Sequence, residues 1–288
     1  MLVGSGSGSE EPRARGRLSA YDLRTGRLRW STATVPEGAN GGGVICSPTV
    51  DLRRGRVYVT TGAPYAAVDG PNPGTCSLLE LRLADGAVTW ADQVHVHDTR
   101  GLDLNGAAVL LGDRAFATAK DGVHGWDRAL RRRVWHTQLT PESQTPGGPS
   151  GPTDGPELGP LATDGRRLYA LSNDGARGVA VAAALDPRDG RVLWRAELPG
   201  LVFAAPALAG NALWTATASG SLHALRTVDG APLAAVDLGE PSAGAVSAAA
   251  GVVLAGTGAA PDLPGESLVC VGAKVSNPAP LVFAVVER

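Results

Sequence analysis

Apolar and polar residues alternate in short runs along most of the chain, and many of these runs are separated by turns rich in Asp and Gly. Leu18–Leu23 and Leu28–Ala33 form one pair of runs, and Val181–Asp186 and Val192–Glu197 form another. Alternation with a period of two residues is typical of half-buried β-strands, and a turn containing Asp and Gly between two such runs is typical of a β-hairpin. We therefore expect a chain built from β-hairpins.

A repeated motif, Asp-x-x-x-Gly-x-x-x-Trp, lies at these turns. It is complete at 22–30 and 186–194 and has one changed position at 82–90 and 127–135, while a weaker copy around Asp229-Gly230 has Ala234 in place of Trp. The glycine positions of the successive copies are Gly26, Gly86, Arg131, Gly190 and Gly230. Their spacing of about 40 residues lies in the range that indicates stacked structural repeats, none of which can bury its apolar face alone.

Two further strands complete each repeat. Segments of small residues are found at 43–50, 104–111, 157–164, 203–210 and 244–251, and segments rich in Val, Leu and Tyr at 56–62, 114–120, 167–173, 212–218 and 252–258. Four antiparallel strands per unit, with the small-residue strand innermost, are typical of propeller blades. We therefore expect an all-β fold, a β-propeller of four-stranded antiparallel blades. The motif tryptophans would fill the space between neighbouring blades; they are Trp30, Trp90, Trp135 and Trp194.

About six blade-like units can be counted, at residues 1–34, 43–94, 104–140, 157–199, 203–239 and 243–288. The first begins with Met1–Ser5, which we interpret as a second strand, so its inner strand is missing. The last would have its third strand at Leu268–Ala273 and its fourth at Leu281–Glu287. An open propeller leaves sheet edges exposed. We therefore expect a single propeller domain over 1–288 with a truncated N-terminal end, and irregular closure by Leu281–Arg288 is the alternative.

Composition excludes several classes of protein. The chain has 288 residues, 43% of them apolar, and a net charge of −2. No apolar run of about 18 residues predicts a membrane span, and no signal peptide is visible in the chain as given. The balanced charge argues against a basic nucleic-acid-binding face. Cys46 and Cys76 would pair only in an oxidising compartment, and unpaired thiols are the favoured interpretation; with Cys270 they show no metal-like spacing.

One pair of histidines has the spacing of metal ligands. His95 and His97 are two residues apart, which places both side chains on one face of a strand. A zinc site needs three or four ligands, and no third ligand is evident nearby in the sequence. We therefore interpret the pair as surface or hydrogen-bonded histidines and expect no metal site.

Four segments in the first half of the chain carry a resemblance to a known family. They are Gly41–Asp51, Gly55–Tyr65, His97–Asp103 and Lys120–Arg128. In this order they are similar to the Gly-Gly-x-x-Trp, Tyr-x-Gly-Thr-Gly-Asn-Pro, His-Asp-x-Trp-Asp-x-Asp and Lys-x-Gly-x-x-Tyr-x-x-Asp-Arg motifs of the quinoprotein alcohol dehydrogenases. These are the pyrroloquinoline quinone (PQQ) β-propellers, and the chain resembles most their polyvinyl-alcohol-dehydrogenase-like branch. Outer-membrane assembly scaffolds and sensor domains of bacterial kinases share the single repeat without the activity.

The resemblance implies which positions would carry catalysis. Gly101 stands where the family has the Asp that takes the substrate's hydroxyl proton, and Ala63 stands where it has an Asn that binds calcium. Ile45 replaces the Trp that stacks under the quinone, and the family's adjacent cysteines are missing. Lys120 matches the residue that would contact the quinone oxygens, so it is the candidate for cofactor binding.

Asp98 and Asp103 flank Gly101 and are the weak candidates for a substitute base. A shift of two residues along an extended chain moves a carboxylate by about 6–7 Å, which argues against the substitution. We therefore expect a binding or scaffold module with a degenerate quinone site and no resident cofactor, which binds a small molecule or protein on the propeller face. The alternatives are a PQQ- and calcium-dependent alcohol dehydrogenase with an altered site and a sensor domain cut from a larger polypeptide. The resemblance also implies a location outside the cytoplasm.

Overall fold

The computed structural model describes residues 1–6, 14–65, 72–104, 106–141, 161–203, 205–249 and 252–257. These residues form strands, turns and loops, and none of them belongs to a helix that could cross a membrane. The chain divides into two compact units, one comprising Met1–Gln138 and Glu142–Pro152 and the other Leu139–Pro141 and Thr153–Arg288. Each unit is a set of antiparallel sheets and is described by itself.

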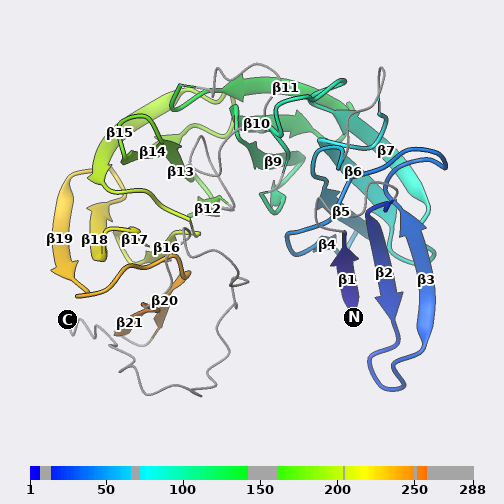
Figure 1. Ribbon diagram of the computed structural model, residues 1–288, viewed down its shortest axis with the longest axis horizontal. Coiled ribbons are helices and arrows are strands. Elements are labelled where there is room, and N and C mark those ends of the chain that lie inside the picture. The colour runs from blue at the N-terminus through cyan, green and yellow to red at the C-terminus, as the bar shows by residue number, and fades with distance from the viewer. Residues whose placement is uncertain are drawn as a thin grey trace. The chain divides into compact units, whose positions relative to one another are not determined.

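The first unit contains one three-stranded and two four-stranded sheets (Figure 1). The three-stranded sheet has β1 (Leu2–Ser5), β2 (Arg17–Tyr21) and β3 (Leu28–Ala33). The next has β4 (Thr49–Asp51), β5 (Arg56–Thr60), β6 (Ser77–Arg82) and β7 (Val88–Gln93), and the last has β8 (Val109–Leu111), β9 (Arg114–Ala119), β10 (Gly122–Asp127) and β11 (Arg132–Thr137). Strands adjacent in sequence pair with one another throughout.

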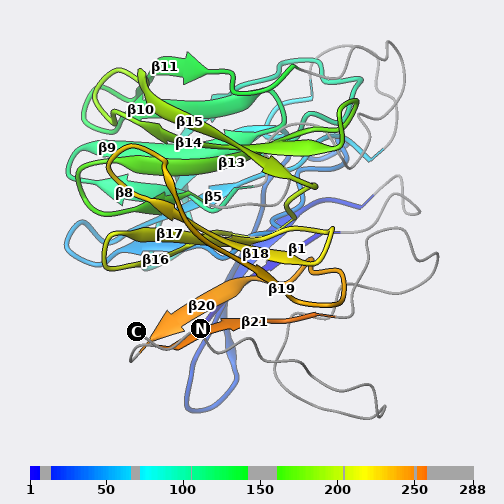
Figure 2. The same ribbon diagram turned by 90° about the vertical axis from the view of Figure 1, so that its left-hand side faces the viewer.

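The second unit contains two four-stranded sheets and one described pair of strands. The first sheet has β12 (Ala162–Thr163), β13 (Leu168–Asp174), β14 (Val179–Leu185) and β15 (Val192–Pro199), and the second has β16 (Ala207–Ala209), β17 (Ala212–Ala216), β18 (Ser221–Arg226) and β19 (Pro232–Asp237). β20 (Val246–Ala249) pairs with β21 (Val252–Ala255). Figure 2 shows the sheet β16–β19 between the other two, and β16 contacts both β12 and β20.

The sheet β4–β7 is covered on both faces. One apolar cluster joins its Val57 and Leu81 to Leu18 of β2, and another joins its Tyr58 to Ala115 of β9. The first five residues of β6 are buried in succession for this reason, whereas β3 has an exposed start. Because no sheet buries both its faces alone, each repeat depends on its neighbours for a core, as in other repeat proteins.

Every motif hairpin turns in the same way. A one-residue shift of register interrupts the pairing next to the turn in all of them, at Ala20/Tyr21, Glu80/Leu81, Gly125/Trp126, Ala184/Leu185 and Ala224/Leu225. In four of the turns the amide at the glycine position donates to the carbonyl four residues earlier, at 2.8–2.9 Å. The glycine position has φ between 70° and 75° where it is Gly, and Arg131 adopts φ 51° at the same position. The left-handed backbone of the turn therefore favours glycine at this position.

The motif tryptophans occupy equivalent places on the outer strands, as predicted. Each is paired with the residue that precedes the register shift on the neighbouring strand; the pairs are Trp30 and Ala20, Trp90 and Glu80, Trp135 and Gly125, and Trp194 and Ala184. Trp30 donates from Nε1 to the carbonyl of Leu83, 3.1 Å away in the next sheet. Trp194 donates in the same way to Thr227, at 2.9 Å.

Glycine at the next turn makes room for these rings. A Cβ atom on Gly86 would lie 2.4 Å from Cε3 of Trp30, and a Cβ atom on Gly230 would lie 2.5 Å from Cε3 of Trp194. Such distances are far below van der Waals contact, so only glycine fits. Trp30 with Gly86, and Trp194 with Gly230, therefore each form one contact between neighbouring repeats, which we call the Trp–Gly contact.

The inner strands are shorter than predicted. Among the described residues of the segments expected at 43–50, 104–111 and 203–210, strand begins only at Thr49, Val109 and Ala207. The prediction was wrong there because the preceding backbone is hydrogen-bonded elsewhere, as when the amide of Leu104 donates to Thr61 at 3.2 Å in the neighbouring sheet. Met1–Ser5 was correctly predicted to begin the first sheet as a second strand.

Other predictions concern the cysteines and the two ends of the chain. The strands expected at 268–273 and 281–287 lie outside the described residues, as does Cys270. Cys46 and Cys76 are unpaired thiols, which confirms the favoured interpretation. A single domain over 1–288 and its truncation stay predictions.

Candidate functional site

The loops that carry the family-like motifs meet in the first unit. The amide of Gly62 donates to the carbonyl of Gly43 at 2.9 Å, and the amide of Lys120 donates to the carbonyl of Leu102 at 2.9 Å. The amide of Leu104 closes the set by its bond to Thr61. The structure therefore brings together segments that are up to about 80 residues apart in sequence.

Asp98 is a structural residue of this loop set. Its Oδ1 accepts the amide of Arg100 at 2.8 Å, and its Oδ2 accepts the amide of Leu102 at 2.7 Å. The buried thiol of Cys76 also donates to Oδ2, at 3.4 Å. Burial, together with the nearby carboxylates of Asp98 and Asp103, raises the pKa of this thiol well above its usual value. Both oxygens of Asp98 thus hold the loop 98–103 in shape.

Asp103 binds the backbone at the position that the resemblance assigns to calcium. Its Oδ1 accepts the amide of Ala63 at 2.5 Å, and its own backbone is in the left-handed region with φ 53°. Gly101, between the two carboxylates in sequence, has φ 68° and no side chain. The structure therefore assigns both weak base candidates to backbone hydrogen bonds.

Two described positions, Ala63 and Ile45, lack the side chains that the resemblance assigns to calcium binding and to stacking under the quinone. Calcium takes six to eight oxygen ligands, but Ala63 presents an amide donor to Asp103 and has no side-chain oxygen. Ile45, at the position of the stacking ring, is 63% exposed. Lys120 is half-buried beside these loops, and it is the residue compared for quinone contact that matches the family motif directly.

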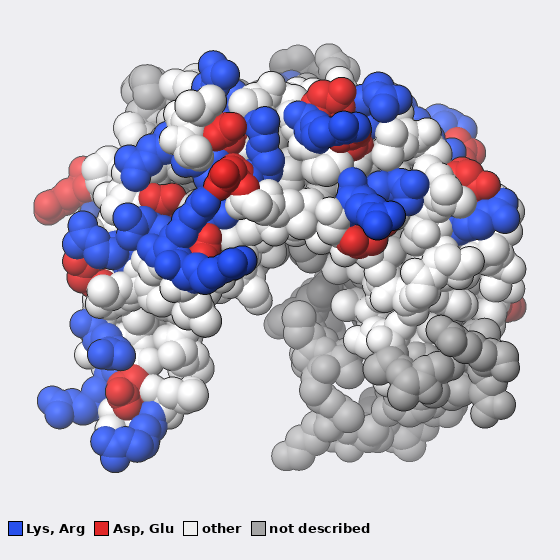
Figure 3. Space-filling view, turned by 180° about the vertical axis from the view of Figure 1, so that it is seen from behind, with Lys and Arg blue, Asp and Glu red and all other residues white. Residues whose placement is uncertain are grey.

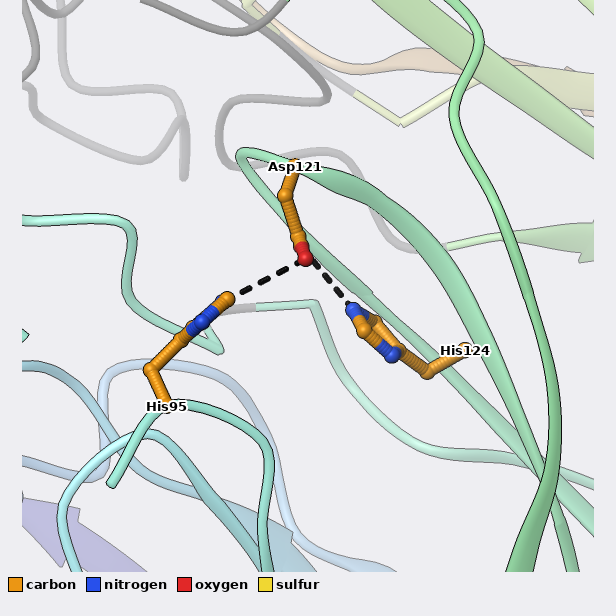
Figure 4. Close-up of side chains that lie close together, drawn as sticks. All are labelled: His95, Asp121 and His124. Carbon is orange, nitrogen blue, oxygen red and sulfur yellow. Dashed lines mark hydrogen bonds and ion pairs between the residues drawn. The ribbon is translucent and has the colours of Figure 1, made fainter.

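A second group of polar side chains lies in the same unit, around Asp121 (Figure 4). His124 Nε2 lies 2.9 Å from Asp121 Oδ1, and His95 Nε2 lies 3.5 Å from Asp121 Oδ2. His136, paired with His124 across β10 and β11, stacks on it with ring centroids 4.4 Å apart. We call His95, Asp121 and His124 the histidine–aspartate cluster.

The charge states within this cluster follow from its burial. Burial alone would raise the pKa of Asp121, but the imidazoles of His124 and His95 outweigh it and hold that pKa well below its usual value. Burial lowers the pKa of His124, and the bond to Asp121 offsets this only in part. At neutral pH the cluster therefore contains an ionised carboxylate and a neutral His124 imidazole.

The expectation that His95 and His97 lie on one face of a strand was wrong, because both residues follow the end of β7. Their interpretation as surface or hydrogen-bonded histidines stays a prediction. His97 is exposed, whereas His95 approaches Asp121 and His124. The sequence analysis missed these two residues because they come from a different sheet. The spacing Asp121-x-x-His124 on a predicted strand was the available signal.

The charged surface of the first unit is mixed in sign. Figure 3 shows arginine and acidic side chains lying against one another. A depression of about 410 Å³ is lined by four arginines and by Glu80, and each arginine has an acidic partner; the pairs are Arg54 and Asp113, Arg56 and Glu80, Arg128 and Asp51, and Arg131 and Glu80. This arrangement forms no uniformly basic face.

Repeated four-stranded antiparallel sheets with equivalent tryptophans define a β-propeller, and the comparisons with known proteins give the family. The PQQ_2 family model, described as outer membrane protein assembly factor BamB, matches residues 12–146 and 119–271. The chain belongs to this family of PQQ-like repeat propellers.

A curated relative extends the likeness. The polyvinylalcohol dehydrogenase of Sphingopyxis sp. (strain 113P3) is 28% identical over 227 residues, which are 62% of this chain and 33% of that protein. This chain therefore matches about a third of that relative's length.

Solved structures share the fold. The quinohemoprotein alcohol dehydrogenase ADHIIG of Pseudomonas putida HK5 superposes with a TM-score of 0.73 at 17% identity, over 90% of this chain and 54% of that one. BamB of Moraxella catarrhalis gives a TM-score of 0.51 at 15% identity, over 88% of this chain and 81% of its own. These likenesses establish the propeller fold.

Proposed function

We propose that this protein is a non-catalytic binding module of the PQQ-like repeat family, with a degenerate quinone site. The observation that supports the proposal is that both candidate bases accept hydrogen bonds from backbone amides. Asp98 and Asp103 accept main-chain amides, and Gly101 has no side chain at the position of the family's base. Alcohol oxidation by a quinone needs a positioned base and a Lewis acid on the quinone, and the positions that the resemblance assigns to the base and to a calcium ligand are Gly101 and Ala63 here.

The binding partner is a small molecule or a protein held by the propeller face. Family membership through a model described as an outer membrane protein assembly factor supports a role in protein binding, as does the fold shared with BamB of Moraxella catarrhalis. Lys120 contributes a cation beside the loop set, so an anionic group of the partner would bind there.

The experiment measures quinone-dependent oxidation. Purified protein is incubated with PQQ and calcium, and reduction of an artificial electron acceptor is followed with primary, secondary and polymeric alcohols. We expect no rate above that of Lys120→Ala, and no calcium-dependent binding of PQQ in equilibrium dialysis. Turnover that is lost in Lys120→Ala would contradict the proposal and support the alternative, a PQQ- and calcium-dependent alcohol dehydrogenase.

A paired variant tests the reason for the inactivity. Gly101→Asp combined with Ala63→Asn returns the two side chains that the resemblance assigns to the base and to calcium. A positioned base contributes about 10²–10⁴-fold to a rate. A measurable rate in the double variant would attribute the loss to these two positions.

A location outside the cytoplasm belongs to the same proposal, since the family resemblance implies it. A phosphatase reporter that is active only outside the cytoplasm, fused to the full-length gene product, measures it. An inactive reporter with a normally expressed fusion would contradict this part.

A further inference from the structure

The histidine–aspartate cluster has the ligand types and spacing of a metal centre. His95 follows β7, Asp121 precedes β10 and His124 lies within β10, so two sheets of one unit contribute to it. One ligand atom from each of the three residues lies within 4.8 Å of the others. Two ligand atoms each about 2.1 Å from a tetrahedral zinc ion lie about 3.4 Å apart, close to the 3.5 Å between His95 and Asp121.

Two polar atoms of the cluster, His95 Nε2 and His124 Nδ1, lack a hydrogen-bond partner among the described residues. His95 Nε2 is buried and makes no hydrogen bond among the described residues, although it points toward the Asp121 carboxylate (Figure 4). A buried nitrogen without a partner is costly. A cation between His95, Asp121 and His124 would satisfy His95 Nε2 and replace the direct contact between His124 and the carboxylate.

We propose that His95, Asp121 and His124 bind a first-row divalent cation of the zinc class. Two imidazoles and a carboxylate are ligands that zinc prefers, whereas calcium prefers an all-oxygen set. Coordination by His124 Nε2 requires the proton of the neutral ring on Nδ1, which is buried without a hydrogen-bond partner among the described residues. The proposal is independent of the quinone site.

His136 positions the cluster. Its ring stacks on His124, and its Nε2 lies 3.1 Å from the main-chain oxygen of Asp121. A depression of about 400 Å³ is lined in part by Asp121, His124 and His136, and in the proposed site a water molecule from it would take the fourth coordination position. Arg133 also lines it and opposes the cation, although its Nε lies 3.8 Å from Asp92.

The test uses the full chain after treatment with a chelator. Zn²⁺ is titrated by calorimetry, and Co²⁺ is titrated by visible absorption, which reports four-coordinate geometry. We expect one equivalent to bind, Zn²⁺ to displace Co²⁺, and Ca²⁺ to do neither. The melting temperature should rise with Zn²⁺.

Matched variants locate the site. His95→Ala should weaken Zn²⁺ binding at least 10-fold and abolish the rise in melting temperature, whereas His97→Ala, an exposed residue two positions away, should retain both. His136→Ala should bind with an intermediate affinity. His95 is at the edge of the cluster, so its variant is expected to fold, and circular dichroism checks this. Absence of stoichiometric binding by the unaltered protein, or equal binding by His95→Ala and His97→Ala, would overturn the proposal.

Discussion

Trp30 and Gly86 belong to different repeats but are in contact, so each limits which side chain fits at the other position. The indole of Trp30 occupies the space where a side chain at position 86 would begin, and its Nε1 is bonded to Leu83 in the same turn. Thr32 adds a bond to the carbonyl of Gly86 at 2.8 Å. The glycine therefore serves two requirements, a left-handed backbone and a surface for the ring.

Gly86→Ala should destabilise the protein more than Gly26→Ala. Both residues have positive φ, 74° and 70°, and alanine in that conformation costs about 1–2 kcal/mol. Only Gly86 faces a ring, since nothing lies within 4 Å of a Cβ on Gly26, and overpacking adds about 1–3 kcal/mol. Urea denaturation measures the difference, and equal losses in the two variants would show that the contact contributes little.

At the scale of single residues, the sequence predicted some of the residues of the candidate site. The motifs identified Asp98, Asp103 and Lys120 as the polar residues near the altered positions, and the loops do meet. What the sequence did not reveal is the bond from Ala63 to Asp103, because it joins residues 40 positions apart. Hydrogen bonds of that range depend on how the sheets pack, and no local pattern encodes them.

The hairpin turn is the best-defined element of the chain. The register shift and the left-handed backbone at the glycine position recur in all five motif hairpins. Arg131 adopts φ 51° at this position although it is not glycine. An L-residue other than glycine in this region carries a backbone cost. The turn geometry is therefore imposed by the strands and their packing, and glycine is its least strained residue.

Replacing Arg131 by Gly should stabilise the protein by up to about 1 kcal/mol. The change also removes an ion pair with Glu80 at 3.5 Å, but the Arg131 side chain is half exposed and such pairs contribute little. Arg131→Ala is the control, because it removes the same pair and keeps the strained backbone. Thermal and urea unfolding should rank Gly above Ala, and the reverse order would show that the conformation carries no cost.

Strand positions were predicted well for the hairpins and poorly for the inner strands. Alternation of apolar and polar residues predicts a strand with one solvent-exposed face. The inner segments are instead rich in small residues, and only a few of their residues pair with the neighbouring strand. Leu104, for example, bonds to Thr61 of the neighbouring sheet. Only the packing of repeats against each other distinguishes such a loop from a strand.

At the scale of the whole molecule, the repeat period predicted the architecture, and long-range contacts decided the chemistry. The period predicted stacked repeats, and the four antiparallel strands in each unit predicted the propeller. The histidine–aspartate cluster joins two repeats that each lack the full set of ligands. A sequence read one repeat at a time cannot contain it.

Stability should decrease as the pH falls from about 7.5 to 5.5. Burial lowers the pKa of His124 and of His223 below the usual value of 6.5. The unfolded state therefore binds more protons than the folded state below that value, so acidification favours unfolding. The free energy of unfolding, measured by urea titration across this range with a chelator present, should fall for the unaltered chain. His124→Gln should reduce the slope, and an unchanged slope would contradict the assignment.

The Trp–Gly contact also determines where recombination between homologous chains can succeed. A crossover between β3 and β4 takes Trp30 from one parent and the turn with Gly86 from the other. The two parents' residues then form a contact for which they were not selected together. A cassette running from one tryptophan strand to the next glycine turn contains both partners. The segment that can be exchanged as a unit therefore does not coincide with one sheet. It begins at the last strand of one sheet and ends at the last turn of the next.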